Sequence, residues 1–145
     1  MDPLQTVLSE LKESIQTASD LAEPFRLFMS NVGENLEFIH RSKKTRHQRI
    51  FDIIKAVVEK RMNHKFSAKK CLVLSVDGAP DFFHGACQFG GTIINVFYFQ
   101  DIGVGMLATS TPSESKMIDY YRFRLIEKTD KDGPSAVHDG STTVH

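Results

Sequence analysis

The sequence contains no tryptophan, only two cysteines and no long apolar run. The cysteines, Cys71 and Cys87, both lie in apolar stretches and give no disulfide framework, so we expect a reducing compartment, the cytoplasm. The longest apolar run, 92–99, is interrupted by Asn95 and is far shorter than the ~18–20 residues that a membrane-spanning helix needs. We therefore expect no membrane as a partner. No cofactor-binding motif is present, and no cofactor is predicted.

A net charge is also lacking, because 18 basic and 18 acidic side chains balance. The balance hides a segregated pattern. Residues 40–70 contain eleven Lys or Arg and two acidic residues, a local net charge of +9, whereas the flanking segments are acidic. A cluster of cations raises the local concentration of anionic partners. This stretch, called the basic segment below, is the most informative feature of the chain.

Length and composition fit one compact domain. A chain of 145 residues with 41% hydrophobic content can bury a single core without disulfides or metals. Residues 129–145 are rich in Asp, Gly, Ser and Thr and contain few aliphatic side chains, so burial cannot offset their ordering entropy. We predict a single domain over 1–128 and a flexible C-terminal tail over 129–145.

Apolar residues recur at helical spacing through the first 62 residues. The stripes predict three helices, over 3–18, 24–39 and 42–62. Gly33 falls inside the second of them, where it favours a bend or a close helix crossing.

After Lys70 the spacing of apolar residues changes to two, and five short runs are rich in Val, Ile, Phe and Tyr. These runs predict strands over 71–77, 82–89, 92–100, 104–109 and 117–128. The links between them are too short for a crossover helix, and Gly90-Gly91 has the chemistry of a hairpin turn. The predicted fold class is α+β, with about three N-terminal helices packed on a five-stranded antiparallel meander sheet.

The middle predicted strand is apolar on both sides, with Ile94, Val96 and Tyr98 alternating with Ile93, Phe97 and Phe99. Because only one set faces the expected core, the second sheet face needs a cover. Our leading hypothesis is a non-enzymatic binding or interaction module that forms a homodimer and uses this second face as a dimer, partner or small-ligand surface. Cover by a helix of the same chain is the structural alternative. The candidate ligand-binding residues are His84, Gln88, Tyr120, Arg122 and Arg124.

The basic segment begins near the start of the third predicted helix. With Ser42 as N-cap, Lys43, Arg46 and His47 fall in line with the apolar stripe of that helix. Cations there oppose the helix dipole, an arrangement that suits a bound phosphate or carboxylate. A solvated surface neutralised by the acidic N-terminal helices is the alternative, and nucleic acid is a second candidate ligand, although the segment lacks interleaved aromatics for base stacking. The candidate anion- or nucleic-acid-binding residues are Arg41, Lys43, Lys44, Arg46, His47 and Arg49.

His84 and Cys87 are three positions apart on a predicted strand. Such positions face opposite sides, so the two residues cannot hold a metal together without a bulge, and no metal site is predicted. Catalysis by His84 with Cys87 or with a nearby carboxylate is a further hypothesis, for which no catalytic residue is assigned.

Overall fold

The fold has three layers, with a β-sheet between two helical layers. The computed structural model describes residues 3–65, 71–111, 118–127 and 134–144, and the side chains of 4–65, 71–111 and 118–125. The elements, in chain order, are α1 (Pro3–Thr17), α2 (Ala22–Val32), the short 3-10 helix η1 (Leu36–Phe38), β1 (Ile39–Arg41), α3 (Gln48–Met62), β2 (Cys71–Val76), β3 (Ala79–Phe89), β4 (Thr92–Phe99), β5 (Val104–Ser110), β6 (Ile118–Glu127) and β7 (Pro134–Val144). The α+β class is confirmed. No helix within these ranges is long and apolar enough to cross a membrane.

All seven strands form one antiparallel sheet in the order of the sequence, from β1 to β7. Short links produce this meander, and β3 and β4 are joined by the predicted hairpin, in which Gly90 has a φ of +60°. Glycine adopts a positive φ without steric cost, so it suits this turn. Five of the strands match the predicted runs, while β1 and β7 have no counterpart in the sequence prediction.

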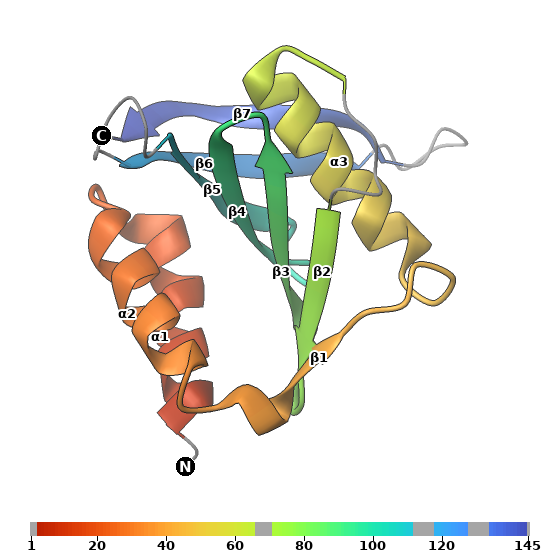
Figure 1. Ribbon diagram of the computed structural model, residues 1–145. Coiled ribbons are helices and arrows are strands. Elements are labelled where there is room, and N and C mark those ends of the chain that lie inside the picture. Colours follow the sequence, from red (N-terminus) through yellow and green to blue (C-terminus); the bar gives the residue numbers. More distant parts are fainter. Residues whose placement is uncertain (1–2, 66–70, 112–117, 128–133, 145) are drawn as a thin grey trace.

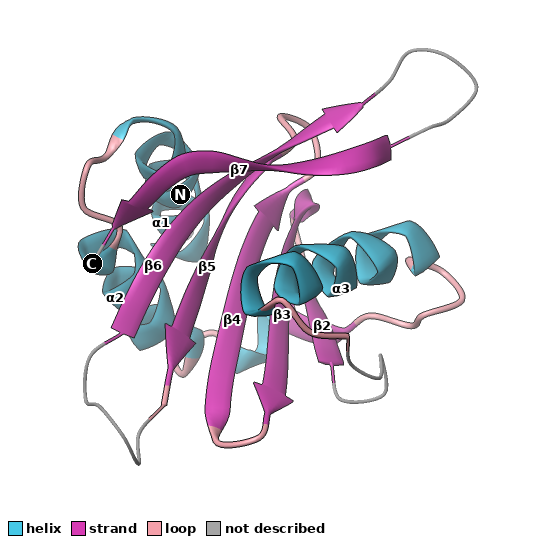
Figure 2. Ribbon diagram, turned by 90° about the horizontal axis from the view of Figure 1, so that it is seen from above, coloured by secondary structure: helices cyan, strands magenta, loops and turns pink. Residues whose placement is uncertain are grey.

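The helices lie on opposite faces of the sheet. Figure 1 and Figure 2 show α1 and α2 together on one face and α3 on the other. The α1–α2 face has a core of aliphatic and phenylalanine side chains that includes Phe82 and Phe97. On the other face, the Ile50, Ile54 and Val57 stripe of α3 packs into a second core. The sheet is therefore buried on both sides where the helices cover it.

This arrangement explains why strand β4 is apolar on both sides. Phe97 and Phe99 are only 1% and 4% exposed in the core of α1 and α2, while Val96 and Tyr98 are buried in the core of α3. The second sheet face is thus covered by helices of the same chain, which was the structural alternative. The observation that favoured a homodimer is explained without a partner, and the oligomeric state itself stays a prediction.

The second helix is shorter than predicted. After Val32 the chain tightens into i→i−3 hydrogen bonds, in which the N–H of Glu34 donates to the carbonyl oxygen of Asn31. Gly33 therefore caps α2 at its C-terminus and does not bend a longer helix. The chain that follows forms η1, which sequence periodicity assigned to the helix, and then β1, of which it assigned only Ile39.

The third helix also begins later than predicted, at Gln48 instead of Ser42. The N–H of Ser42 donates to the carbonyl oxygen of Val73 on β2, at 2.8 Å. This hydrogen bond extends the β1–β2 ladder by one residue and keeps Ser42 out of the helix. A contact between residues 31 positions apart thus overrides the local N-cap signal.

The C-terminal segment contains a strand that the sequence did not predict. Residues Pro134–Val144 form β7, which pairs with β6 in antiparallel register. The edge of β6 offers backbone hydrogen-bond partners to a neighbouring strand. Amino-acid composition does not reveal such pairing. Residues 128–133 and 145 lie outside the described residues, and flexibility of the segment stays a prediction.

Candidate anion site at the start of helix α3

The link between β1 and α3 carries the densest part of the basic segment. It leaves β1 at Ser42 and makes one turn, in which the N–H groups of Arg46 and His47 both donate to the carbonyl oxygen of Lys43, at 3.1 and 3.0 Å. The helix follows at Gln48 with His47 as N-cap, and no side chain caps it. The turn therefore places cationic side chains beside the N–H groups of an uncapped helix start.

A cavity of about 580 Å³ lies at this turn and is called the turn cavity below. Its lining includes residues of the turn and residues of the β2–β3 hairpin, which the fold brings together from distant parts of the sequence. The residues that matter chemically are Arg41, Ser42, Lys43, Arg46, His47 and Asp77. A cavity of this size can hold a small ligand.

Three cations that line the turn cavity have no acidic partner. Arg41, Lys43 and Arg46 are exposed, and no carboxylate of the described residues lies within ion-pair distance of them. Asp77 also lines the cavity, but His40 contacts it, with 2.9 Å between His40 Nε2 and Asp77 Oδ2. The cavity therefore has an excess of positive charge that the described side chains leave unneutralised.

Two buried polar atoms at the turn, Ser42 Oγ and His47 Nδ1, have no hydrogen-bond partner among the described residues. Ser42 is 6% exposed, and a buried hydroxyl without a partner costs about 1–3 kcal/mol. The His47 ring packs edge-on against Phe83, with 5.1 Å between ring centroids, so it is positioned by the hairpin. Unsatisfied buried polar atoms indicate a place where a ligand or an ordered water completes the hydrogen bonding.

The acidic N-terminal helices do not neutralise the basic segment. α1 and α2 lie across the sheet from α3 (Figure 1), and Glu23 pairs with Arg26 of its own helix. Within the described part of the chain, Glu10, Glu13 and Asp20 form no ion pair with the basic segment. The solvated-surface alternative depended on such contacts for its neutralisation.

The remaining two candidates of the basic segment lie apart from the turn cavity. Lys44 lines a second cavity of about 580 Å³, which shares Arg41, Ser42 and Lys43 with the first and adds Cys71. Arg49 is exposed on the first turn of α3 and lines neither cavity. The structure thus brings four of the six predicted residues to the turn cavity.

The five residues predicted as ligand-binding lie on one sheet face, that of α1 and α2, but they form no open site. The cross-strand register runs from His84 through Phe97 and Met106 to Arg122, which places the outer two on the same face. His84 and Tyr120 are buried, while Gln88 and Arg124 are exposed. Because α1 and α2 cover the centre of this face, these residues do not converge on one cavity.

His84 is a core residue on this face. Its Nε2 lies 2.8 Å from Oδ1 of Asn95, and its ring packs edge-on against Phe28 and Phe97, with 5.8 and 4.8 Å between ring centroids. Burial lowers the pKa of His84, and the hydrogen bond with Asn95 partly opposes that shift. The imidazole is therefore held in its neutral form, a structural role.

Acidification is expected to destabilise the protein through His84. Because its pKa is lower in the folded state than in the unfolded state, the full contribution is present above the unfolded value of about 6.5 and is lost as the pH falls below it. The slope reaches at most about 1.4 kcal/mol per pH unit for one proton. Denaturant unfolding between pH 8 and pH 5 measures it. A His84→Gln variant should lose this component, and parallel profiles for the two proteins would contradict the assignment.

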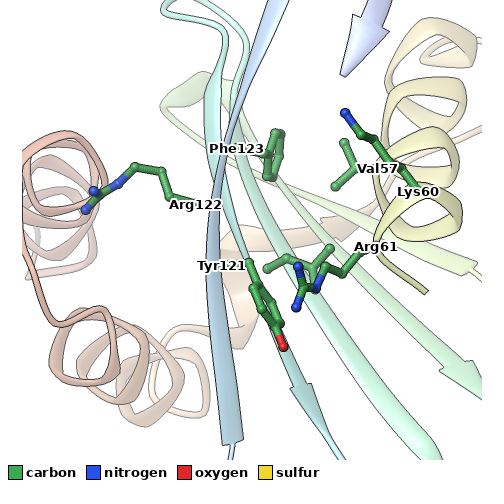
Figure 3. A pocket seen from close by; sticks show the side chains of 7 residues that line it. Val57, Lys60, Arg61, Tyr121, Arg122 and Phe123 are labelled. Atoms are coloured by element: carbon green, nitrogen blue, oxygen red, sulfur yellow. The ribbon is translucent and has the colours of Figure 1, made fainter. Parts of the chain in front are cut away.

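Arg122 points away from the α3 side of the sheet. Figure 3 shows its side chain extending toward the opposite helices, while Tyr121 and Phe123 face α3. Its guanidinium donates to the carbonyl oxygens of Ile15 and Ala18, at the C-terminal end of α1. Arg122 therefore fastens α1 to the sheet and is engaged by the protein itself.

The small cavity of Figure 3 lies between α3 and the sheet and is lined by Val57, Lys60, Arg61, Leu107, Tyr121, Arg122 and Phe123. Its volume of about 20 Å³ leaves room for one water molecule. Two of the lining residues make a cation–π contact, in which the Arg61 guanidinium lies 3.2 Å from the centroid of the Tyr121 ring. This cavity is a packing feature and not a ligand site.

The enzymatic hypothesis loses its proposed residues. His84 faces α2, whereas Cys87 belongs to the core of α3, so the two side chains are on opposite sides of the sheet. Register between β3 and its neighbours is regular at both positions. The sequence spacing had predicted the opposite orientations, and the structure now shows that the two residues cannot act together on one substrate. The His84 ring bonds to an amide and not to a carboxylate.

Sequence reasoning found the cations of the turn cavity but missed its other wall. Ser42 was assigned to a helix cap, and Asp77 and Phe83 were assigned to strands without a role in a site. These residues meet only because β1 pairs with β2, with Ile39 opposite Val76. No local signal in the sequence marks a pairing between a three-residue strand and a strand 30 residues later.

No known protein family, curated protein or solved structure matches this chain. The fold alone does not indicate an activity, because similar architectures carry unrelated functions. Function must therefore be inferred from the chemistry of the turn cavity.

Proposed function

We propose that this protein is a non-enzymatic binding module that holds a phosphate group of a small ligand in the turn cavity. The observation that carries the proposal is the meeting of three unpaired cations, an uncapped helix start and a buried Ser42 hydroxyl without a partner at one cavity. Each of these features has a disadvantage that a bound anion reduces. A bound phosphate removes all three disadvantages together.

The physical chemistry favours an anion for two independent reasons. Cations at a helix N-terminus repel the positive end of the helix dipole, and an anion placed between them is attracted by both. A phosphate also accepts several hydrogen bonds, so it can satisfy N–H groups of the turn and the Ser42 hydroxyl at the same time. Arg41 and Arg46 supply guanidinium groups, whose geometry suits phosphate oxygens.

The surroundings favour a compact ligand over single-stranded nucleic acid. Base stacking needs accessible aromatic faces, and Phe83, the phenylalanine of the turn cavity, is buried against His47. We therefore favour a small phosphorylated ligand and leave nucleic acid as an outcome of the test.

Inorganic phosphate is expected to raise the melting temperature of the protein at constant ionic strength, with a free-energy gain of about 2.7 kcal/mol at a hundredfold excess over the dissociation constant. Arg46→Glu should abolish the gain, because it replaces a lining cation by an acid. Thermal melting in phosphate against chloride measures both.

Arg124→Glu is the matched control for this experiment. It makes the same change of charge at an exposed position of β6 outside the turn cavity, so the response to phosphate should persist. An equal loss in both variants, or no response in the wild type, would refute the proposal. Tight binding of an oligonucleotide that weakens steeply with salt, without a response to phosphate, would favour nucleic acid instead.

Self-association is a separate part of the proposed function. Among the described residues, the large apolar side chains that remain exposed are Leu27, Leu36 and Ile93. Light scattering at high micromolar concentration distinguishes a homodimer from a monomer. A monomer would remove self-association from the proposed function and leave ligand binding alone.

A further inference from the structure

The two cysteines of the chain face each other across neighbouring strands. Cys71 of β2 and Cys87 of β3 are direct partners in the antiparallel register. Their sulfur atoms are 2.7 Å apart, both thiols are free, and both side chains are buried, with 8% and 4% exposure. The sequence placed both in apolar stretches and gave no disulfide framework.

This geometry allows a disulfide with little movement of the backbone. Directly opposed residues of antiparallel strands have Cα atoms about 4.5 or 5.5 Å apart, and both spacings fall in the range of about 4.4–6.8 Å that disulfides occupy. The sulfur atoms need only a short approach from 2.7 Å to the ~2.05 Å of an S–S bond. The fold has therefore placed the two thiols in position to react with each other.

The surroundings distinguish the two sulfurs. Cys71 lines the second cavity, together with the cationic side chains of Arg41, Lys43 and Lys44, and Cys87 does not. The hydrogen bond that the Cys87 thiol donates lowers the pKa of Cys71 although burial opposes it, and the same bond and burial raise the pKa of Cys87. Cys71 is thus the thiol with access and thiolate character, and Cys87 is the second thiol beside it.

We propose that Cys71 and Cys87 form a redox site, in which a small hydroperoxide oxidises Cys71 and Cys87 then closes an intramolecular disulfide. The Cys71 thiol releases its proton, and the thiolate attacks one peroxide oxygen. The O–O bond breaks, the leaving hydroxide or alkoxide takes up that proton, and the products are a sulfenic acid and water or an alcohol. The Cys87 sulfur attacks the sulfenic sulfur, the S–O bond breaks, and the released hydroxide takes the Cys87 proton to form water. Two thiols lose two electrons, and one peroxide gains them.

Burial selects the class of oxidant. Hydrogen peroxide is nearly as small as water and can reach a thiol that lines a cavity. Exchange with a bulky disulfide would instead require a mixed disulfide, with a large group attached to a buried sulfur. A peroxide-type oxidant is therefore favoured over thiol–disulfide exchange with a large partner. Neither cysteine lines the turn cavity, although the second cavity shares Arg41, Ser42 and Lys43 with it.

The first test uses the wild-type protein with hydrogen peroxide, followed by alkylation and intact-mass analysis without reductant. Both thiols should disappear together, with loss of the mass of two hydrogen atoms and no dimer, and dithiothreitol should restore them. The native protein should react at least about tenfold faster than the guanidinium-unfolded protein, because the fold provides thiolate and proximity. Burial alone predicts the reverse order, and that result would overturn the proposal.

Two variants separate the roles of the cysteines. Cys87→Ser should stop at the sulfenic acid, which gains one oxygen atom and reacts with dimedone. Cys71→Ser should lose its remaining thiol at least about tenfold more slowly than Cys87→Ser does. Circular dichroism reports whether each variant is folded. If a variant does not fold, the comparison of native with unfolded wild-type protein still tests the proposal. Equal rates in two folded variants, or a disulfide between two copies of the chain, would also overturn the assignment.

Discussion

Gly105→Ala is expected to destabilise the protein by at least about 3 kcal/mol. A variant that is unfolded at 37 °C would also agree with this prediction. Gly105 lies on β5 between Tyr98 of β4 and Phe123 of β6. A Cβ atom built there would overlap the Phe123 ring and the carbonyl oxygen of Phe97. The ring can move only by leaving its stack with Tyr98, and the carbonyl can move only by separating paired strands.

Gly33→Ala is the matched control for that substitution. A Cβ atom at Gly33 meets nothing within 4 Å, and its φ of −62° suits any residue. Alanine there should stabilise the protein by about 0.4–1 kcal/mol, because it lowers the entropy of the unfolded chain. Urea unfolding of both variants measures the contrast. A Gly105→Ala protein as stable as the wild type would show that β5 and β6 are not packed as described.

Arg122→Met is expected to cost about 2–3 kcal/mol, the second largest effect on stability among these substitutions. The guanidinium donates to Ile15 and Ala18 at the end of α1, and charged donors there also favour the helix dipole. Methionine keeps most of the aliphatic stem over the sheet but removes both hydrogen bonds. Urea unfolding, together with faster amide hydrogen exchange in α1, measures the loss.

Arg124→Met controls for the loss of a positive charge from the same face of β6. Arg124 is exposed, so its replacement should change stability by less than about 0.5 kcal/mol. If the two variants were equally stable, Arg122 would not fasten α1 to the sheet, and its earlier interpretation as a ligand-binding residue would regain support.

Local periodicity predicted most of the elements because the side chains themselves encode it. The Leu4, Leu8 and Leu11 stripe and the β-branched runs after Lys70 correspond to α1 and to the strands from β2 to β6. Two of the failures occurred where the decisive contact is distant in sequence. β1 exists because its three residues pair with β2, and the start of α3 moved because Ser42 bonds to Val73.

The placement of the helices could not be read from the sequence. An apolar stripe shows that a helix is buried on one side, but it does not show which face of the sheet the helix covers. The doubly apolar β4 correctly indicated that both faces are covered, and it gave no means of choosing between a helix of the same chain and a second copy of the chain. Burial of Phe97 and Phe99 by the chain's own helices resolved that choice.

The candidate site was predictable in its charge and not in its shape. Arg41, Lys43 and Arg46 stand out in the sequence because their charge is segregated. The concave surface and the unsatisfied Ser42 hydroxyl depend on the β2–β3 hairpin, which lies more than 30 residues further along the chain. A basic segment therefore indicates an anion but does not indicate where the anion sits.

An NMR titration with inorganic phosphate tests the proposed anion site most directly. Binding in the turn cavity should produce saturable amide shifts confined to residues 41–50 and 75–78, and these shifts should vanish in Arg46→Glu and persist in Arg124→Glu. Shifts spread over all exposed cations without saturation, or a localised response that survives Arg46→Glu, would contradict phosphate binding at the start of α3.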